Sequence, residues 1–185
     1  MLIDITLKLT SQMEEEVQAN RNRALLGHLG THFDVMNKVF PLAYTRREGI
    51  VFDVAAVGEG EIQCGDIDLS LVKAGMFVSF YTNYIERCGY GSKGYFSNHP
   101  QLSHELIDAL LSKCVSIIGI DSAGIRRGKE HTPADQRCAD ANCFVIENLC
   151  GLGEVLAQGG RFIAHTYPMR YEGLTGLPCR VIAEV

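Results

Sequence analysis

The alternation of apolar and polar positions predicts β-strands at both ends of the chain. Residues 1–9 alternate between apolar and polar side chains, which indicates a short strand. The same criterion, together with apolar runs that end at glycine, predicts further strands at 49–57, 76–81, 161–167 and 180–185. A turn-rich segment at 172–178 separates the last two predicted strands.

A helical period replaces this alternation in the middle of the chain. Over residues 103–113 the apolar side chains share one helical face, and they are Leu106, Ile107, Leu110 and Leu111. Ser103 stands where an N-cap residue is expected. The apolar run at 115–120 then resembles a fully buried strand. A helix that leads into a buried strand is typical of α/β proteins.

Three further segments complete the predicted fold. The charged stretch 14–23 indicates a solvated helix or loop, and Thr132-Pro133 indicates the start of a helix with proline at its favoured first position. Residues 143–146 are again strand-like. The chain has 185 residues, near the common domain size, and shows no internal repeat or linker. We therefore predict one domain over 1–185 with an α/β fold, a mixed sheet with flanking helices.

Composition and charge exclude two classes of protein. The chain is 46% hydrophobic and 21% charged, as ordinary globular proteins are. Its net charge is -5 and its longest basic groups are the pairs 46–47 and 126–127, which argues against nucleic-acid binding. No apolar run reaches the roughly 18 to 20 residues that span a bilayer. The first residues do not resemble a signal peptide, so we expect no membrane association and a cytoplasmic location.

The segment His28-Leu-Gly-Thr-His32-Phe-Asp34 places three good metal-binding side chains within seven residues. Imidazole and carboxylate ligands suit zinc, manganese or iron. In a flat strand His28 and Asp34 would lie about 20 Å apart, too far to share an ion. Gly30 permits a turn that would bring His28 and His32 together. The alternative is that both histidines are polar loop residues and Asp34 is a surface carboxylate.

Glu147 ends the apolar run that begins at Cys143. A carboxylate at such a place is costly to bury unless a cation or a hydrogen-bond donor meets it. Glu147 is therefore either at a solvent-exposed strand end or bound to something.

Four sequence blocks together resemble one known family. Residues 28–34 reproduce the first seven positions of the motif HxGTHxDxPxH. Gly119-Ile-Asp-Ser122 is similar to a GID(T/S) block, Ile146-Glu-Asn-Leu149 to an IEN(L) block, and 167–180 to a closing P-x-x-x-x-G-x-x-G-x-P-x-R block. In this order and over nearly the whole chain, they resemble the kynurenine formamidase, or cyclase, family of metal-dependent hydrolases.

This resemblance implies a fold, a reaction and a metal centre. The fold would be the swivelling β/β/α architecture. The reaction would be arylformamidase-like hydrolysis of an amide, N-formyl, cyclic amide or lactone bond in a small-molecule substrate, through a metal-activated water. The cofactor would be one or two divalent ions, Zn or Mn, and the protein would be a homodimer or homotetramer. His28, His32 and Asp34 would bind one metal, and Glu147 would help to hold a second.

The chain departs from the family at the second metal. Twelve residues before the glutamate the family has a histidine, whereas this chain has Asp135. A carboxylate can replace imidazole as a zinc or manganese ligand. Alternatively, Asp135 is third after Thr132 and would face a helix N-terminus as a cap. His131 is a fallback ligand if the local alignment is shifted.

The second departure is Lys38, which stands where the family has its proton-shuttling histidine. Lysine has an ordinary pKa of about 10.4, so it is a poor base at neutral pH. Nearby metal ions would lower that pKa and make Lys38 a catalytic base, or a charged Lys38 could hold an anionic substrate. It could also be a solvated loop lysine. The replacement leaves two other functions open: a divergent protein that binds metal and a small molecule without the parent hydrolysis, or a lyase or isomerase with Lys38 as base.

Overall fold

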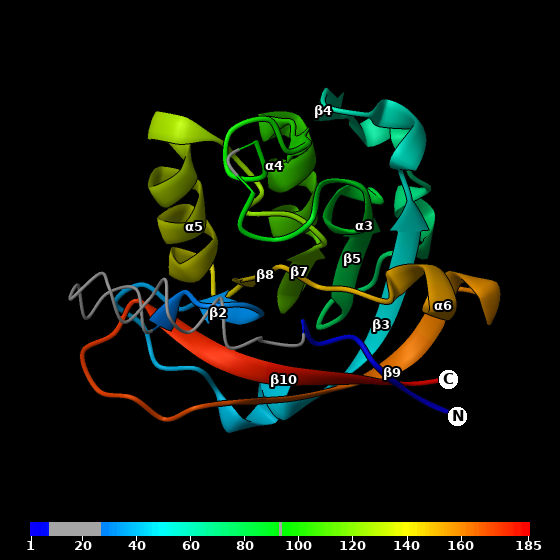
Figure 1. Ribbon diagram of the computed structural model, residues 1–185. Helices are drawn as coiled ribbons and strands as arrows, with labels where there is room; N and C mark the ends of the chain where they lie inside the picture. Colours follow the sequence, from blue (N-terminus) through cyan, green and yellow to red (C-terminus); the bar gives the residue numbers. More distant parts are fainter. Residues whose placement is uncertain (8–26, 93) are drawn as a thin grey trace.

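A mixed sheet that closes on itself forms the frame of the molecule (Figure 1). The computed structural model describes residues 1–7, 27–92 and 94–185. Within these residues one sheet has eight strands in the order β1-β10-β2-β8-β7-β5-β3-β9, and β9 also pairs with β10, so seven strands make a closed ring. The strands are β1 (Leu2–Asp4), β2 (His32–Asp34), β3 (Arg46–Asp53), β5 (Phe77–Tyr81), β7 (Ile117–Ile120), β8 (Phe144–Glu147), β9 (Arg161–Pro168) and β10 (Gly176–Glu184).

The centre of the sheet is parallel and the rest is antiparallel. β3, β5, β7 and β8 pair in parallel, whereas β2 and β9 join antiparallel neighbours. A small parallel sheet joins β4 (Glu61–Ile62) to β6 (Gln101–Leu102). The α-helices in the described part of the chain are α3 (Tyr84–Cys88), α4 (His104–Ser112), α5 (His131–Asp140) and α6 (Leu152–Ala157). Figure 1 shows α3, α4 and α5 on one side of β5, β7 and β8, with β9 and β10 on the opposite side.

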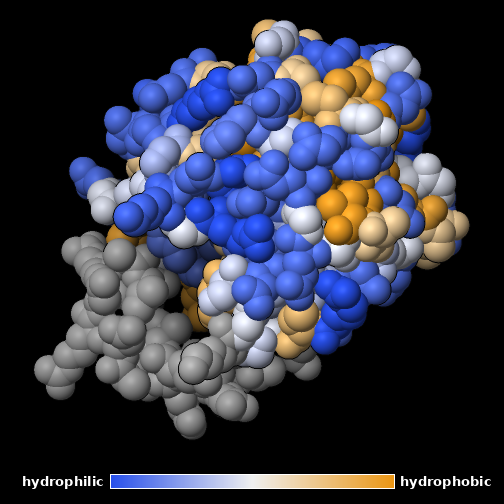
Figure 2. All heavy atoms as spheres, turned by 90° about the horizontal axis from the view of Figure 1, so that it is seen from above, coloured by the Kyte–Doolittle hydropathy of each residue, from blue (hydrophilic) through white to orange (hydrophobic). Residues whose placement is uncertain are grey.

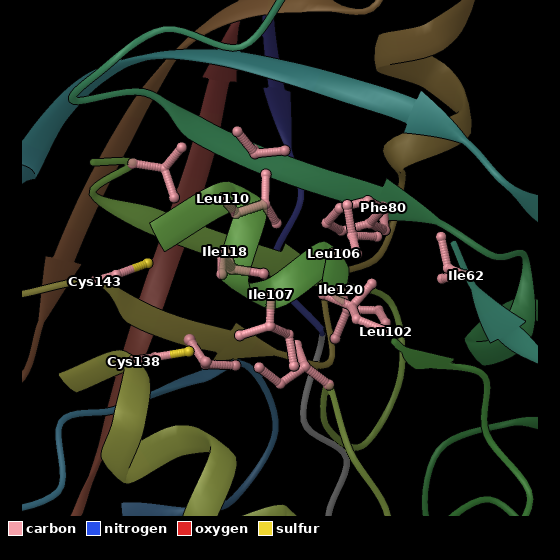
Figure 3. Close-up of a cluster of buried hydrophobic side chains, with 14 of the residues drawn as sticks. Ile62, Phe80, Leu102, Leu106, Ile107, Leu110, Ile118, Ile120, Cys138 and Cys143 are labelled. Carbon is pink, nitrogen blue, oxygen red and sulfur yellow. The ribbon is translucent and has the colours of Figure 1, made fainter. Parts of the chain in front are cut away.

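The parallel strands β5, β7 and β8 are buried on both faces, because one face meets the helices and the other points into the ring. Ile118 and Ile120 of β7 pack against Leu106 and Leu110 of α4 (Figure 3). Ile117 points the other way and belongs to a second cluster with Phe33, Phe77 and other residues of the inner face. The two faces explain why all four residues of β7 are buried, as the apolar run predicted.

The outer surfaces of the helices are polar. Figure 2 views the molecule from above the helical side of Figure 1, and most of this face is hydrophilic, with apolar residues in smaller groups. No helix in the described part of the chain is long and apolar enough to cross a membrane.

The structure confirms most predicted elements and shifts some boundaries. The helix predicted over 103–113 is α4, and Ser103 caps it by accepting a hydrogen bond from the Leu106 amide. The strand predicted at 49–57 ends at Asp53, because Ala55–Val57 form a 3₁₀ turn. β10 begins at Gly176, inside the predicted turn segment. The charged stretch 14–23 and residues 8–9 of the first predicted strand lie outside the described residues.

The pairing of β3 with β9 leads to a prediction about Gly49, a position at which a larger side chain should destabilise the fold. Gly49 lies opposite Phe162, and a Cβ at Gly49 would stand 2.4 Å from Cζ of that buried ring, which also packs edge-on against Phe77. We expect Gly49→Ala to lower the free energy of unfolding by about 1–3 kcal/mol, because the ring must shift in a packed core. Urea unfolding measures the change. Gly65→Ala, where the new Cβ would meet nothing within 4 Å, is the control; equal losses in both variants would contradict this account.

Candidate metal centre

The turn before β2 brings the first predicted ligand set together. Gly30 has φ +66°, and the chain turns there before β2 starts at His32. His32 and Asp34 then lie on the same side of β2, because they are two residues apart in a strand. The Nδ1 atom of His28 lies 3.1 Å from both His32 Nε2 and Asp34 Oδ1. Asp34 is buried, so it is not the surface carboxylate of the alternative interpretation.

A second set comes from the start of α5 and the end of β8. His131 Nε2 lies 3.4 Å from Asp135 Oδ2 and 3.6 Å from Glu147 Oε1. His131 and Asp135 share one helical face because they are four residues apart. Within each of the two sets, one candidate ligand atom per residue can be chosen so that the atoms lie within 4.8 Å of one another.

The structure distinguishes between the alternative interpretations of Asp135 and of Glu147. α5 begins at His131, its N-cap residue is Glu130, and its first turn holds no acidic residue, so the helix-cap interpretation of Asp135 is wrong. Asp135 instead lies one turn inside the helix and is buried. Glu147 is 4% exposed, so it does not stand at a solvent-exposed strand end. His131, the fallback residue, joins the site.

The two sets adjoin, because β2 and β8 are antiparallel neighbours with His32 directly opposite Glu147. Residues directly opposite in such a pair point to the same face of the sheet. His32 Nε2 accordingly lies 3.7 Å from Glu147 Oε2 and 3.7 Å from Asp34 Oδ1. The six side chains therefore form one continuous site.

The backbone and Thr175 fix the orientation of all three imidazoles. Each histidine has one ring nitrogen within hydrogen-bond distance of an oxygen outside the carboxylate cluster, which leaves the other nitrogen turned toward the carboxylates. Such bonds set the tautomer of metal-binding histidines in proteins. The three contacts are His28 Nε2 with Thr175 Oγ1 at 3.0 Å, His32 Nδ1 with the Gly30 carbonyl at 2.8 Å, and His131 Nδ1 with the Arg126 carbonyl at 3.1 Å.

Three buried carboxylate oxygens have no hydrogen-bond partner among the described residues: Asp34 Oδ2, Asp135 Oδ1 and Glu147 Oε1. Buried polar atoms are nearly always paired, since an unpaired one keeps its full desolvation cost. All three belong to the site, and their oxygens together with the imidazole nitrogens are the donors that a divalent cation takes. The residues present therefore fit a metal.

The pKa shifts of the three carboxyl groups also indicate that the site suits a cation. Burial and then the charge of Asp34 raise the pKa of Asp135 well above its ordinary value. Burial, Asp34 and Asp135 do the same to the pKa of Glu147. Burial also acts to raise the pKa of Asp34, but His32 and His28 outweigh it and lower that pKa overall. Three carboxylates at this spacing repel one another, and a cation between them would relieve that repulsion.

Lys38 lies in the loop after β2 and pairs with a residue outside the six. Its Nζ is 2.7 Å from Asp140 Oδ1, at the last residue of α5, and both side chains are partly exposed. A second contact joins the same loop to α5, because Gln136 Nε2 donates to Asn37 Oδ1. Lys38 is therefore placed near α5 by an ion pair, and its catalytic role stays a prediction.

A groove of about 1170 Å³ lies beside the site. Val35, which follows Asp34, and Thr175, which contacts His28, both line it. Lys38 and Arg170 supply positive charge to its wall, and Glu172 supplies a negative charge. Apolar side chains form much of the remaining wall, among them Met36, Phe40, Leu42, Tyr167, Met169 and Tyr171.

The sequence matches the model of the cyclase family over residues 3–126. Because this match covers more than half of the 185 residues, the chain belongs to the cyclase family, which confirms the resemblance of its motifs. A comparison with curated proteins finds no match.

Solved structures share the fold over almost the whole chain. One is a potential metal-dependent hydrolase with cyclase activity, 22% identical over 99% of this chain and 98% of that chain, with a TM-score of 0.77. Another, described as a predicted metal-dependent hydrolase from Bacillus stearothermophilus, is 22% identical over 99% and 97%, with a TM-score of 0.76. Isatin hydrolase A from Ralstonia solanacearum is 18% identical over 99% and 91%, with a TM-score of 0.75. These similarities confirm the α/β fold with a mixed sheet.

The sequence predicted His131 only as a fallback ligand and did not predict Thr175 at all. His131 carried a usable signal, because a histidine four residues before Asp135 on a helix shares its face. Thr175 carried none, since its contact with His28 joins residues 147 positions apart.

Gly124 lies against the second set of candidate ligands, and a substitution there should displace two of them. Gly124 has φ +125°, and a Cβ there would stand 2.6 Å from the His131 ring and 2.9 Å from Glu147 Oε1. We expect Gly124→Ala to displace both side chains and lower the zinc content of protein loaded with zinc, as measured by elemental analysis. Gly128→Ala is the control, since Gly128 also has a positive φ, +58°, but an open environment. An undiminished zinc content in Gly124→Ala would contradict the assignment of the second set.

Proposed function

We propose that this chain is a metal-dependent hydrolase that opens an amide, N-formyl, cyclic amide or lactone bond. The observation that carries the proposal is a cluster of three buried carboxylates and three oriented imidazoles, in which each carboxylate keeps one oxygen without a hydrogen-bond partner among the described residues. Membership of the cyclase family supports it, and so do structural neighbours described as metal-dependent hydrolases and isatin hydrolases.

The six residues would hold one or two ions. His28, His32 and Asp34 offer two nitrogens and one oxygen, which suits Zn²⁺ or Mn²⁺. His131, Asp135 and Glu147 offer one nitrogen and two oxygens, a harder set that favours Mn²⁺ more than the first does. When bound, a divalent metal lowers the pKa of a water molecule and polarises a carbonyl oxygen, and both effects favour hydrolysis.

The chain itself contributes orientation and a dry environment. His32, Asp34, Asp135 and Glu147 are all buried, which strengthens electrostatic interactions at the reacting bond. The apolar and aromatic wall of the adjacent groove suits the organic part of a substrate.

Lys38 could act as a base or bind an anionic substrate group, and its contacts support the second role. Its Nζ atom is held 2.7 Å from Asp140 Oδ1, at the end of α5 and outside the six side chains of the site. Together with Arg170 on the same groove, this supports binding of an anionic substrate group by Lys38 rather than base catalysis.

Metal dependence tests the proposal directly. We expect purified protein loaded with Zn²⁺ or Mn²⁺ to hydrolyse at least one of N-formylkynurenine, isatin and simple lactones, and to lose this activity after treatment with a chelator. His32→Ala should remove most bound metal, because the variant lacks a central ligand. His165→Ala is the control, since His165 lies on β9 and contacts Glu184. Metal binding without turnover of any of these substrates would instead support the divergent binding protein.

Kinetics separate the two roles of Lys38. If Lys38 holds an anionic group, Lys38→Ala should raise KM by about 10-fold, the equivalent of roughly 1.4 kcal/mol, and leave kcat nearly unchanged. Steady-state kinetics with an anionic substrate measure both constants. Asp140→Asn is the control, because it removes the ion pair and retains the lysine. A collapse of kcat in Lys38→Ala with KM nearly unchanged would instead make Lys38 a catalytic base.

A further inference from the structure

The Gly30 carbonyl accepts hydrogen bonds from two side chains next to the candidate metal centre. The His32 ring bonds to it through Nδ1 at 2.8 Å, and Asn148 Nδ2 donates to the same oxygen at 2.9 Å. Since Nδ1 carries the proton in this bond, Nε2 of His32 is the nitrogen that faces Asp34 and Glu147. The position of one backbone oxygen thus sets both the tautomer and the angle of this ring.

Asn148 is itself held on three sides. Tyr95 Oη donates to Asn148 Oδ1 at 2.7 Å, Thr31 Oγ1 donates to the Asn148 carbonyl at 2.7 Å, and the Asn148 amide donates to the Ser122 carbonyl at 3.0 Å. Both Tyr95 and Asn148 are buried. Asn148 has φ +58°, a left-handed conformation that asparagine tolerates better than most residues, and it immediately follows Glu147.

The amide side chain suits this place because it accepts at one atom and donates at the other. A carboxylate of the same shape could still accept from Tyr95 but could not donate to the Gly30 carbonyl. Both ends of the amide are therefore fixed, because its oxygen accepts from the Tyr95 hydroxyl and its nitrogen donates to the Gly30 carbonyl.

We propose that Tyr95 and Asn148 are positioning residues of the metal centre, which fix His32 through the Gly30 carbonyl. This inference rests on the proposed function, because it requires a metal at His32. Neither residue touches the ligand atoms of the six side chains; each acts through the backbone of the turn that precedes β2.

Cobalt(II) is the probe that tests the inference, because its visible absorption reports the geometry of its ligands. We expect Tyr95→Phe and Asn148→Asp to weaken Co²⁺ binding by up to about 10-fold, the lower end of the roughly 10- to 100-fold effect of losing a direct partner of a ligating histidine. The absorption spectrum of the saturated variants should also change. A role in folding alone would lower stability and leave the spectrum of the folded, saturated protein as in wild type.

Tyr84→Phe is the matched control. Tyr84 is buried in the same aromatic cluster and packs on Tyr95 with ring centroids 5.6 Å apart, but its hydroxyl donates to the Gly94 carbonyl. We expect its Co²⁺ affinity and spectrum to equal those of wild type. An equal loss in Tyr84→Phe, or wild-type affinity and spectrum in Tyr95→Phe, would overturn the inference. Tyr95→Phe removes a single oxygen, so it serves as the test if Asn148→Asp does not fold. Wild-type protein that binds no Co²⁺ would overturn the proposed function itself.

Discussion

The burial of three carboxylates in one site is the constraint on which the rest of the structure depends. Asp34, Asp135 and Glu147 lie at most a few per cent exposed, and each keeps an oxygen without a hydrogen-bond partner in the described part of the chain. Buried carboxylates repel one another and lose their hydration, so an arrangement of this kind needs a compensating positive charge. The surrounding imidazoles provide part of it, and a divalent ion would provide the rest.

The sheet makes this arrangement possible by joining segments of opposite direction. The parallel strands β7 and β8 end at the same edge, and α5, which connects them, carries His131 and Asp135 to that edge. β2 runs antiparallel to β8, so its first residue meets the last residue of β8. Ligands commonly gather at the carboxyl ends of parallel strands, and here a short antiparallel strand completes the set.

The helix explains how the family's histidine can be absent without loss of an imidazole. Asp135 stands at the family's histidine position, and His131 lies one turn earlier on the same face of α5. Compared with the family's motif, this arrangement has one more carboxylate, and its imidazole lies one helical turn earlier in α5. As proposed ligands, His131, Asp135 and Glu147 would form a set richer in oxygen, which suits harder cations.

The sequence by itself determined the local features. It showed that Gly30 permits a turn that would join His28, His32 and Asp34. It also predicted the capped helix α4 and the apolar runs of β7 and β8, because spacing and periodicity are properties of neighbouring residues. Only the tertiary structure decided that β10 begins at Gly176, since that strand end depends on its pairing with β2. It also decided which carboxylates are buried together and which residue Lys38 contacts. These features depend on contacts between residues far apart in the chain, which no local pattern records.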